Sequence, residues 1–144
     1  MKKLCFIITI ILLLTFSLSA EEIILQPGSE GMDAWIYSRS DLQGVNYGND
    51  TEIYATNRDS MGSGYGLIKF DMSTITASNV SSAIISLYMF SSNVTDQSNK
   101  NVYISQITES WLESTVTWSN QPSFTNVGQV YQNIAHGYVG WVSW

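Results

Sequence analysis

The sequence predicts an all-β domain that follows an export signal. After residue 20 the chain is rich in Ser, Thr, Val, Ile, Tyr, Trp, Asn and Gly and poor in Leu, Ala, Glu and Lys. Such residues favour pleated, half-buried strands and the turns between them. Short apolar runs also recur between clusters of turn-forming residues, a spacing typical of a β-sandwich or a β-barrel.

Residues 1–20 have the three parts of a signal peptide. Lys2 and Lys3 form a charged start, residues 4–16 are apolar, and Ser-Leu-Ser-Ala at 17–20 offers a small-residue cleavage site. The apolar run is shorter than the roughly 20 residues that cross a bilayer. We therefore expect cleavage after Ala20 and a secreted product, with an uncleaved signal anchor as the alternative.

The mature chain, residues 21–144, is long enough for one domain with a buried core. Cleavage removes Cys5, the only cysteine, and with it any thiolate metal site or disulfide. It also removes two of the six basic residues, Lys2 and Lys3. Four basic and 12 acidic residues then remain, and the net charge becomes −8. An acidic chain without a basic stripe is a poor partner for nucleic acid or for an anionic membrane surface.

The expected strands follow one another along the whole mature chain. They are residues 22–25, 34–38, 52–56, 66–70, 83–90, 102–107, 115–118, 127–131 and 139–144. Residues 83–90 show the clearest alternation, and we expect a central strand with these residues in the core: Ala83, Ile85, Leu87 and Met89. Residues 108–114 are predicted to form one short helical turn around Trp111 and Leu112.

Five segments carry a resemblance to a known family. The most specific is residues 108–122, where a Trp and a short acidic turn precede Val-Thr-Trp-Ser-Asn-Gln-Pro; the others are residues 25–36, 46–48, 67–75 and 82–88. The chain resembles the secreted DNRLRE-type domains, also called disaggregatase-related repeats, which are grouped with carbohydrate-binding module family 96. The resemblance covers nearly all of the mature chain.

This resemblance implies an antiparallel β-sandwich of jelly-roll type on a secreted protein. Such domains are often attached to enzymes or cell-surface proteins. Relatives usually continue beyond a segment like Trp-Val-Ser-Trp at 141–144 with further strands. We therefore expect a C-terminally truncated chain that has lost its last strands and any domains that followed.

Sugar-binding sites combine aromatic ring faces with polar groups that reach sugar hydroxyls. The mature chain has five tryptophans and eight tyrosines, and those in loops are the informative ones. We name Tyr47 beside Asn46, Tyr65 in a glycine-rich loop, and Arg39 as carbohydrate-binding candidates. The alternative for the other large rings is a structural role in the core or at a corner of the sandwich: Trp35, Trp111, Trp118 and Tyr88.

A structural calcium ion would require six to eight oxygen ligands. The available carboxylates are Glu30, Asp33, Asp71 and Asp96. No Asp-x-Asp-x-Asp-Gly loop is present, so the sequence supports no cofactor, and Asp71 is better explained as the cap of a turn.

No arrangement typical of catalysis is found, and we predict that the chain is not an enzyme. Glu109 and Glu113 are spaced to lie side by side on one turn, whereas the carboxyl groups of a glycosidase face each other across a cleft. His136 is the sole histidine, and the mature chain contains no cysteine nucleophile and no Gly-x-Ser-x-Gly elbow that it could activate as a general base.

The sequence thus predicts a secreted, non-catalytic carbohydrate-binding module that anchors a larger extracellular protein to polysaccharide. Relatives are linked to acidic polysaccharides, but a net charge of −8 favours a neutral or a metal-bridged glycan. The alternative is a structural or adhesive sandwich that serves as a spacer in a cell-surface protein and has no glycan site.

Overall fold

The computed structural model describes residues 22–26, 31–58, 62–76, 80–92 and 97–144. All its sheets are antiparallel, which confirms the all-β class. The elements are β1 (Gly31–Tyr37), β2 (Thr56–Arg58), β3 (Gly62–Phe70), β4 (Ser86–Met89), β5 (Lys100–Ile107), the 3₁₀ turn η2 (Trp118–Asn120), β6 (Phe124–Ile134) and β7 (Gly140–Ser143). Across these ranges no helix is both long and apolar enough to span a bilayer.

Strand β3 lies between β1 and β2 in a three-stranded sheet. Ala34 pairs with Leu67 and Ile36 pairs with Tyr65, so all four side chains lie on one face of the sheet. Ala34, Ile36 and Leu67 are buried there together with Trp111 and Val116, which follow β5. This cluster is the core that joins the sheet to the second half of the chain.

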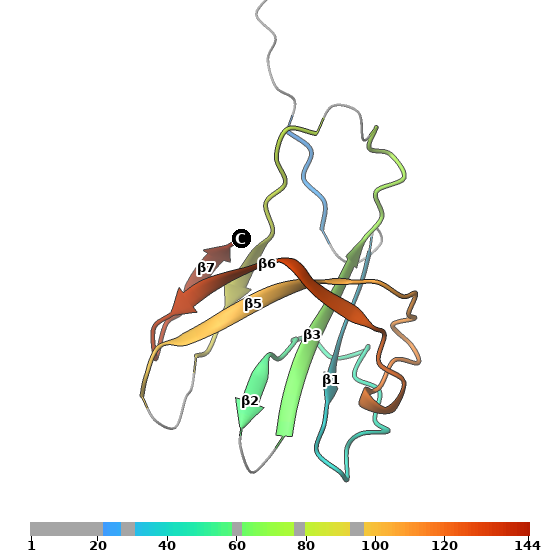
Figure 1. Cartoon of the computed structure of the whole chain (residues 1–144), viewed down its shortest axis with the longest axis vertical. Coiled ribbons are helices and arrows are strands. Elements are labelled where there is room, and N and C mark those ends of the chain that lie inside the picture. The colour runs from blue at the N-terminus through green and yellow to red at the C-terminus, as the bar shows by residue number, and fades with distance from the viewer. Residues whose placement is uncertain (1–21, 27–30, 59–61, 77–79, 93–96) are drawn as a thin grey trace, which may run out of the picture.

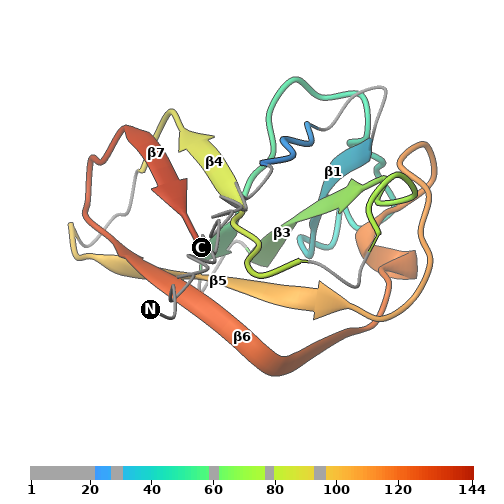
Figure 2. The ribbon, with the colours of Figure 1, turned by 90° about the horizontal axis from the view of Figure 1, so that it is seen from above.

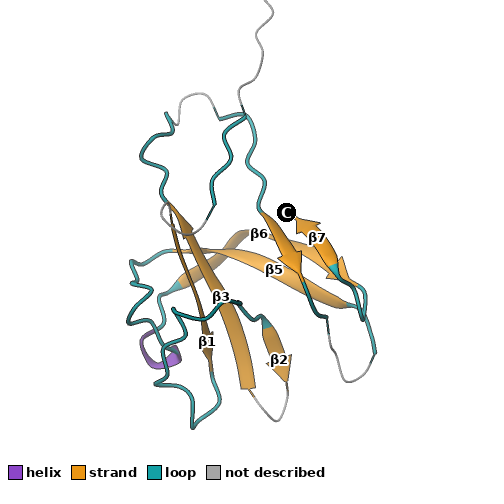
Figure 3. Cartoon of the chain, turned by 180° about the vertical axis from the view of Figure 1, so that it is seen from behind, coloured by secondary structure: helices purple, strands orange, loops and turns teal. Residues whose placement is uncertain are grey.

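The pairs β5–β6 and β4–β7 build the rest of the molecule. Figures 1 and 2 show β5 and β6 on one side of the other strands. One end of the β5–β6 pair crosses β1 and β3, and β4 and β7 lie over its other end. The view from behind places β1 and β3 in front of β5 and β6 (Figure 3). Two side chains join β7 to this pair: Gln132 Nε2 donates to the Ser143 carbonyl at 2.7 Å, and Trp144 Nε1 donates to the Val102 carbonyl at 3.2 Å.

Strand β4 is shorter and more peripheral than the alternation of residues 83–90 predicts. Among the described strands it pairs with β7 alone, so the central position expected for it is wrong. Ile85, Leu87 and Met89 do face inward, but they are half-buried rather than core residues, and Ala83 is exposed. The alternating pattern correctly gave the direction of the side chains, but alternation carries no information about how many neighbours a strand has.

Three other expected elements are absent, and a fourth, the strand expected at residues 52–56, overlaps β2 only at Thr56. Residues 22–25 and 115–118 form no strand, and residues 108–114 form turns instead of a helix. Tertiary contacts explain the missing helix: Glu109 Oε2 accepts a hydrogen bond from the backbone N–H of Ser123 at 2.8 Å, and Trp111 is buried in the core. Residues 112–116 are closed into a turn, because the N–H groups of Thr115 and Val116 both donate to the Leu112 carbonyl, and Trp118 begins η2.

The turn at residues 46–48 packs directly against the backbone of residues 113–116. The side-chain amide of Asn46 donates to the carbonyls of Glu113 and Val116, at 2.8 and 2.7 Å. Gly48 lies so close that a Cβ there would overlap the Glu113 carbonyl oxygen. A residue without a side chain is therefore required at position 48 for this contact.

Replacing Gly48 with alanine is expected to destabilise the protein. The added methyl group must push the two backbone segments apart, and overpacking of this kind costs about 1–3 kcal/mol. Gly44→Ala is the matched control, because a Cβ at position 44 meets nothing within 4 Å. Chemical denaturation of both variants measures the difference, and equal unfolding free energies would contradict the packing described here.

Candidate functional site

An open groove lies between strand β3, the turn η2 and the start of β6. Its volume is about 420 Å³ and its walls are formed by Tyr65, Trp118, Gln121, Pro122, Ser123 and Phe124. Ligand sites for small molecules occupy roughly 300–1,000 Å³. The groove therefore has room for a single sugar ring or a similarly sized group.

Three aromatic rings form the apolar part of this groove. The ring centroids of Tyr65 and Trp118 are 5.1 Å apart with planes inclined by 41°, and those of Tyr65 and Phe124 are 5.8 Å apart with planes near perpendicular at 78°. Tyr65 and Phe124 keep 39% and 48% of their surface exposed. Part of each residue is therefore open to a ligand, while the contacts of Tyr65 with Phe124 and with Trp118 restrict the movement of its ring.

The polar groups of the groove are uncharged. Gln121 brings an amide and Ser123 a hydroxyl, and none of the six lining residues carries a charge. A carboxylate borders the groove, because Glu109 accepts the backbone hydrogen bond from Ser123. That hydrogen bond lowers the pKa of Glu109, so a negative charge is kept at this edge.

The motif Thr-Trp-Ser-Asn shapes one wall of the groove through a small hydrogen-bond network. Asn120 Oδ1 accepts from the backbone N–H of Thr117 at 2.6 Å, and Asn120 Nδ2 donates to the Thr115 carbonyl at 3.0 Å. These bonds close the chain into the turn η2 and fix the position of Trp118. Pro122, which is buried, then leads into β6.

Tyr47 lies in a second aromatic group on the other face of the sheet. Its ring stacks on Trp35 with centroids 3.9 Å apart, and Tyr54 packs edge-on against the same indole at 4.9 Å. Trp35 Nε1 donates to Asp50 Oδ2 at 2.7 Å. Burial raises the pKa of the Tyr47 phenol, as expected for a ring that another ring covers.

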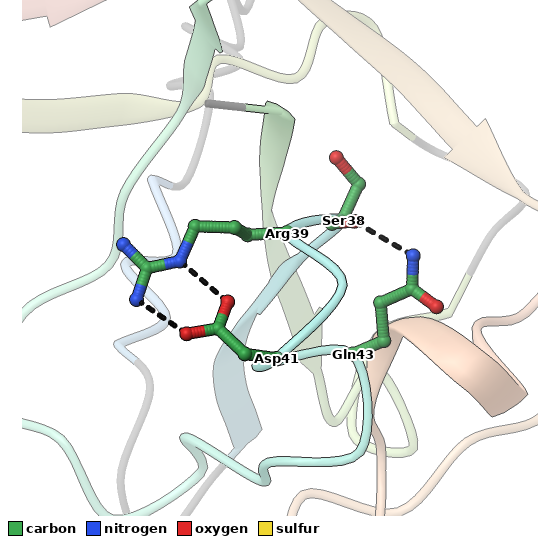
Figure 4. Close-up of polar contacts among 4 residues, drawn as sticks. All are labelled: Ser38, Arg39, Asp41 and Gln43. Carbon is green, nitrogen blue, oxygen red and sulfur yellow. Dashed lines mark hydrogen bonds and ion pairs between the residues drawn. The ribbon is translucent and has the colours of Figure 1, made fainter. Parts of the chain in front are cut away.

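Arg39 and Asn46 both form contacts within the protein. The Arg39 guanidinium donates two hydrogen bonds to the Asp41 carboxylate, at 2.7 and 3.0 Å, while Gln43 Nε2 bonds to the Ser38 carbonyl (Figure 4). Asn46 holds the turn against residues 113–116, and its Oδ1 accepts from the Gly48 N–H at 3.3 Å. In this structure both side chains thus order the chain between β1 and β2.

The four residues named from the sequence do not form one site. Tyr47, Asn46 and Arg39 lie in the segment after β1, where Tyr47 covers Trp35. Trp35 pairs with Gly66 whereas Tyr65 pairs with Ile36, so Trp35 and Tyr65 point to opposite faces of the sheet. Tyr65 is the member of the set that lines the groove.

The carboxylates considered for metal binding or catalysis are dispersed. Glu109 and Glu113 bond to different backbone segments, since Glu113 Oε1 accepts from the Asp33 N–H at 3.2 Å. Asp71 accepts from the Ser73 N–H at 2.9 Å, which confirms its predicted role as a turn cap. Glu30 and Asp96 lie outside the described residues, and within those residues no three His, Cys, Asp or Glu side chains are grouped for a metal ion.

The profile of carbohydrate-binding module family 96 matches residues 29–144. The chain belongs to this family. The match includes every described strand of the module and all residues of the groove, and it confirms the family resemblance. No curated protein and no solved structure matched the chain.

Four groove residues were not among those named from the sequence: Gln121, Pro122, Ser123 and Phe124. The strand there was expected to begin at residue 127, whereas β6 begins at Phe124. Trp118 was expected in the core or at a corner of the sandwich; it packs against the core and also forms one wall of the groove. The signal available in the sequence was the run Trp-Ser-Asn-Gln-Pro, which places an aromatic and an amide beside a rigid proline.

Replacing Asp33 with asparagine is expected to stabilise the module near neutral pH. Burial, and then repulsion from Glu113, raise the pKa of Asp33, so the folded state holds this proton more tightly than the unfolded state. Ionisation of Asp33 therefore lowers the free energy of unfolding. This loss of stability is absent in acid and develops as the pH rises through the raised pKa. The gain from Asp33→Asn in melting temperature should therefore shrink as the pH falls.

Asp41→Asn provides a comparison of opposite sign. The hydrogen bond from Arg39 lowers the pKa of Asp41. The ionised Asp41 carboxylate therefore stabilises the folded state above the ordinary carboxyl pKa, and this stabilisation is lost in acid. This variant should be the less stable one at neutral pH and should match the parent at low pH. Parallel pH profiles for the two variants would contradict the electrostatics described here.

Proposed function

We propose that this protein is a secreted, non-catalytic carbohydrate-binding module that anchors a larger extracellular protein to polysaccharide. The groove of Tyr65, Trp118 and Phe124 is the site at which the glycan binds. The observation that carries the proposal is the combination, in a chain of carbohydrate-binding module family 96, of exposed ring surface with an amide and a hydroxyl in one groove.

Each part of the groove matches a part of a sugar ring. The C–H-rich face of a pyranose is apolar and packs on an aromatic ring, while its hydroxyls exchange hydrogen bonds with amide and hydroxyl groups. The rings of Tyr65 and Phe124 supply the first contact, and Gln121 and Ser123 supply the second. Since Tyr65 also contacts Trp118, its ring is held in place before the ligand arrives, which lowers the entropic cost of binding.

The charge of this region favours a neutral glycan over a polyanion. None of the lining residues is positive, and Glu109 keeps a negative charge at the border of the groove. The chain as a whole is also acidic, with a net charge of −6 before any cleavage. Both the local and the long-range field therefore oppose the approach of an acidic polysaccharide.

The proposal extends to the context of the module. Cleavage after Ala20, export from the cell and attachment to further domains are part of this proposal, which the signal-like residues 1–20 and the family support. A jelly-roll sandwich is the architecture proposed for the module. It is supported by the antiparallel pairs and by the position of β5 and β6 over the other strands.

A structural spacer without a glycan site is the second candidate function. It is favoured by the aromatic group around Trp35, in which Tyr47 stacks on the indole and Tyr54, although exposed, packs edge-on against it. If the contacts of Tyr65 with Trp118 served stability alone, its loss would weaken the fold and change no ligand affinity. The two functions therefore differ in what the Tyr65→Ala variant does.

Tyr65→Ala is expected to abolish retardation of the protein in gels that contain a neutral polysaccharide such as hydroxyethyl cellulose, xylan or galactomannan. Loss of one stacking aromatic at the centre of a site typically costs 2 kcal/mol or more, about a thirty-fold loss of affinity. Tyr88→Ala is the matched control, because Tyr88 is likewise exposed and likewise contacts a tryptophan ring, that of Trp141, away from the groove.

Near-UV circular dichroism must first show that both variants are folded. Retardation that is unchanged in folded Tyr65→Ala would exclude the groove as the glycan site. If no polysaccharide retards the parent protein, the spacer function is supported.

Expression of the full chain in a secreting host tests the predicted export. We expect the protein in the culture medium, with Glu21 as its first residue in the intact mass. A product that stays with the cells and retains Met1 would indicate a signal anchor and would contradict cleavage.

A further inference from the structure

We propose that the outer face of the β5–β6 pair is a second glycan-binding surface, independent of the groove. The tyrosine platform, as we call it, consists of Tyr103, Tyr131, Asn101, Asn133 and Gln129. This inference rests on the proposed function, because it takes the ligand to be a neutral polysaccharide. It adds a second contact through which the same polysaccharide chain is held.

Two tyrosines form the centre of the platform. Tyr103 of β5 and Tyr131 of β6 are directly paired across the ladder, and their ring centroids are 5.4 Å apart. They keep 52% and 57% of their surface exposed, more than Tyr65 in the groove. Neighbouring rings held on adjacent strands present a wide apolar surface on which sugar rings can pack.

Amide groups lie on one side of the tyrosines. Asn133 Nδ2 donates to Asn101 Oδ1 at 2.7 Å, and Asn99 Nδ2 donates to Asn133 Oδ1 at 3.0 Å. Asn101 Nδ2 is 3.4 Å from the Tyr103 hydroxyl, which connects the amides to the ring. Each amide has several donor and acceptor positions, so these bonds orient the groups and leave capacity for sugar hydroxyls.

A second polar cluster lies on the other side of the rings. Gln129 Nε2 donates to Ser105 Oγ at 2.7 Å and lies 3.4 Å from Asn126 Oδ1. From Asn101 to Ser105 the strand rises about 13 Å, at roughly 3.3 Å per residue. The order along the strands is therefore amides, rings, amides, over a length that accommodates more than one sugar unit.

The platform faces away from the rest of the molecule. The opposite face of the pair contains Val102, Ile104 and the buried Ile134, and β7 is bound on that side through Gln132 and Trp144. Figures 1 and 2 agree that β5 and β6 lie on one side of all other strands. The outer face is thus accessible to a long polymer.

The chemistry of the platform favours a glycan over a protein partner. Its five side chains include no charged residue and no aliphatic residue, whereas the buried core of a protein interface is more apolar. The β4–β7 pair shows the contrast, because Trp141 is exposed there and the aliphatic residues Ile84 and Val139 are exposed just before the two strands. A surface of two rings and three amides has the composition suited to a neutral, hydroxyl-rich ligand.

The experiment compares double variants of the two tyrosines in the full chain, exported and purified as above. Tyr103→Ala/Tyr131→Ala removes both rings, whereas Tyr103→Phe/Tyr131→Phe keeps the rings and removes only the hydroxyls. Affinities are measured by retardation in gels that contain graded concentrations of hydroxyethyl cellulose, xylan or galactomannan. Because two linked contacts bind more tightly than one, the alanine variant should lose on the order of ten-fold or more in apparent affinity and the phenylalanine variant much less.

The outcomes separate this inference from the proposed function. Weaker retardation of a folded, monomeric alanine variant, with the phenylalanine variant close to the parent, supports the platform. If Tyr65→Ala abolishes retardation while the alanine double variant equals the parent, the platform is excluded and the groove stands. If the double variant alone loses binding, the platform is the glycan site and the groove is not. Failure of every glycan to retard the parent overturns both.

Size-exclusion chromatography tests the competing occupant. If the parent is a dimer and the alanine double variant is a monomer, the platform is a contact between two copies of the chain and the glycan inference is wrong.

Discussion

The contact between the turn at residues 46–48 and the backbone of residues 113–116 is the constraint on which the rest of the structure depends. Asn46 donates to two carbonyls there, and Gly48 allows the two backbones to touch. Trp111 and Val116 enter the core beside this contact. Because Val116 directly precedes the Thr-Trp-Ser-Asn turn, the same contact determines where Trp118 lies, and with it one wall of the groove.

Hydrogen bonds between side chains and backbone groups take the place of regular structure over much of residues 108–123. Glu109 bonds to Ser123, Glu113 bonds to Asp33, and Asn120 closes the turn of η2. Each of these acceptors satisfies a backbone N–H that would otherwise lack a partner within a strand or helix. Residues 108–123 can therefore be irregular and still hold the groove in a defined shape.

The sequence predicted the strand-rich class, the family and one groove residue, Tyr65, because these depend on local pattern and on motif. It did not predict that residues 108–114 would be drawn into turns, since the contacts of Glu109 and Trp111 join positions far apart in the chain. Tyr47 and Tyr65 look alike in sequence, as both are loop-like tyrosines beside glycines. Only the pairing register of the sheet distinguishes them. It places Trp35 and Tyr65 on opposite faces, and Tyr47 covers Trp35.

The alternation of side chains along β5 and β6 has a consequence for how such a module evolves. The residues that point outward, such as Tyr103 and Tyr131, are separate from those that point inward, such as Ile104 and Ile134. Substitutions on the outer face of a strand pair usually change stability little, so selection can alter that surface without disturbing the fold. Substitutions in the groove are more constrained, because Trp118 also packs against the core. A change at Trp118 therefore alters the stability of the fold together with the shape of the groove.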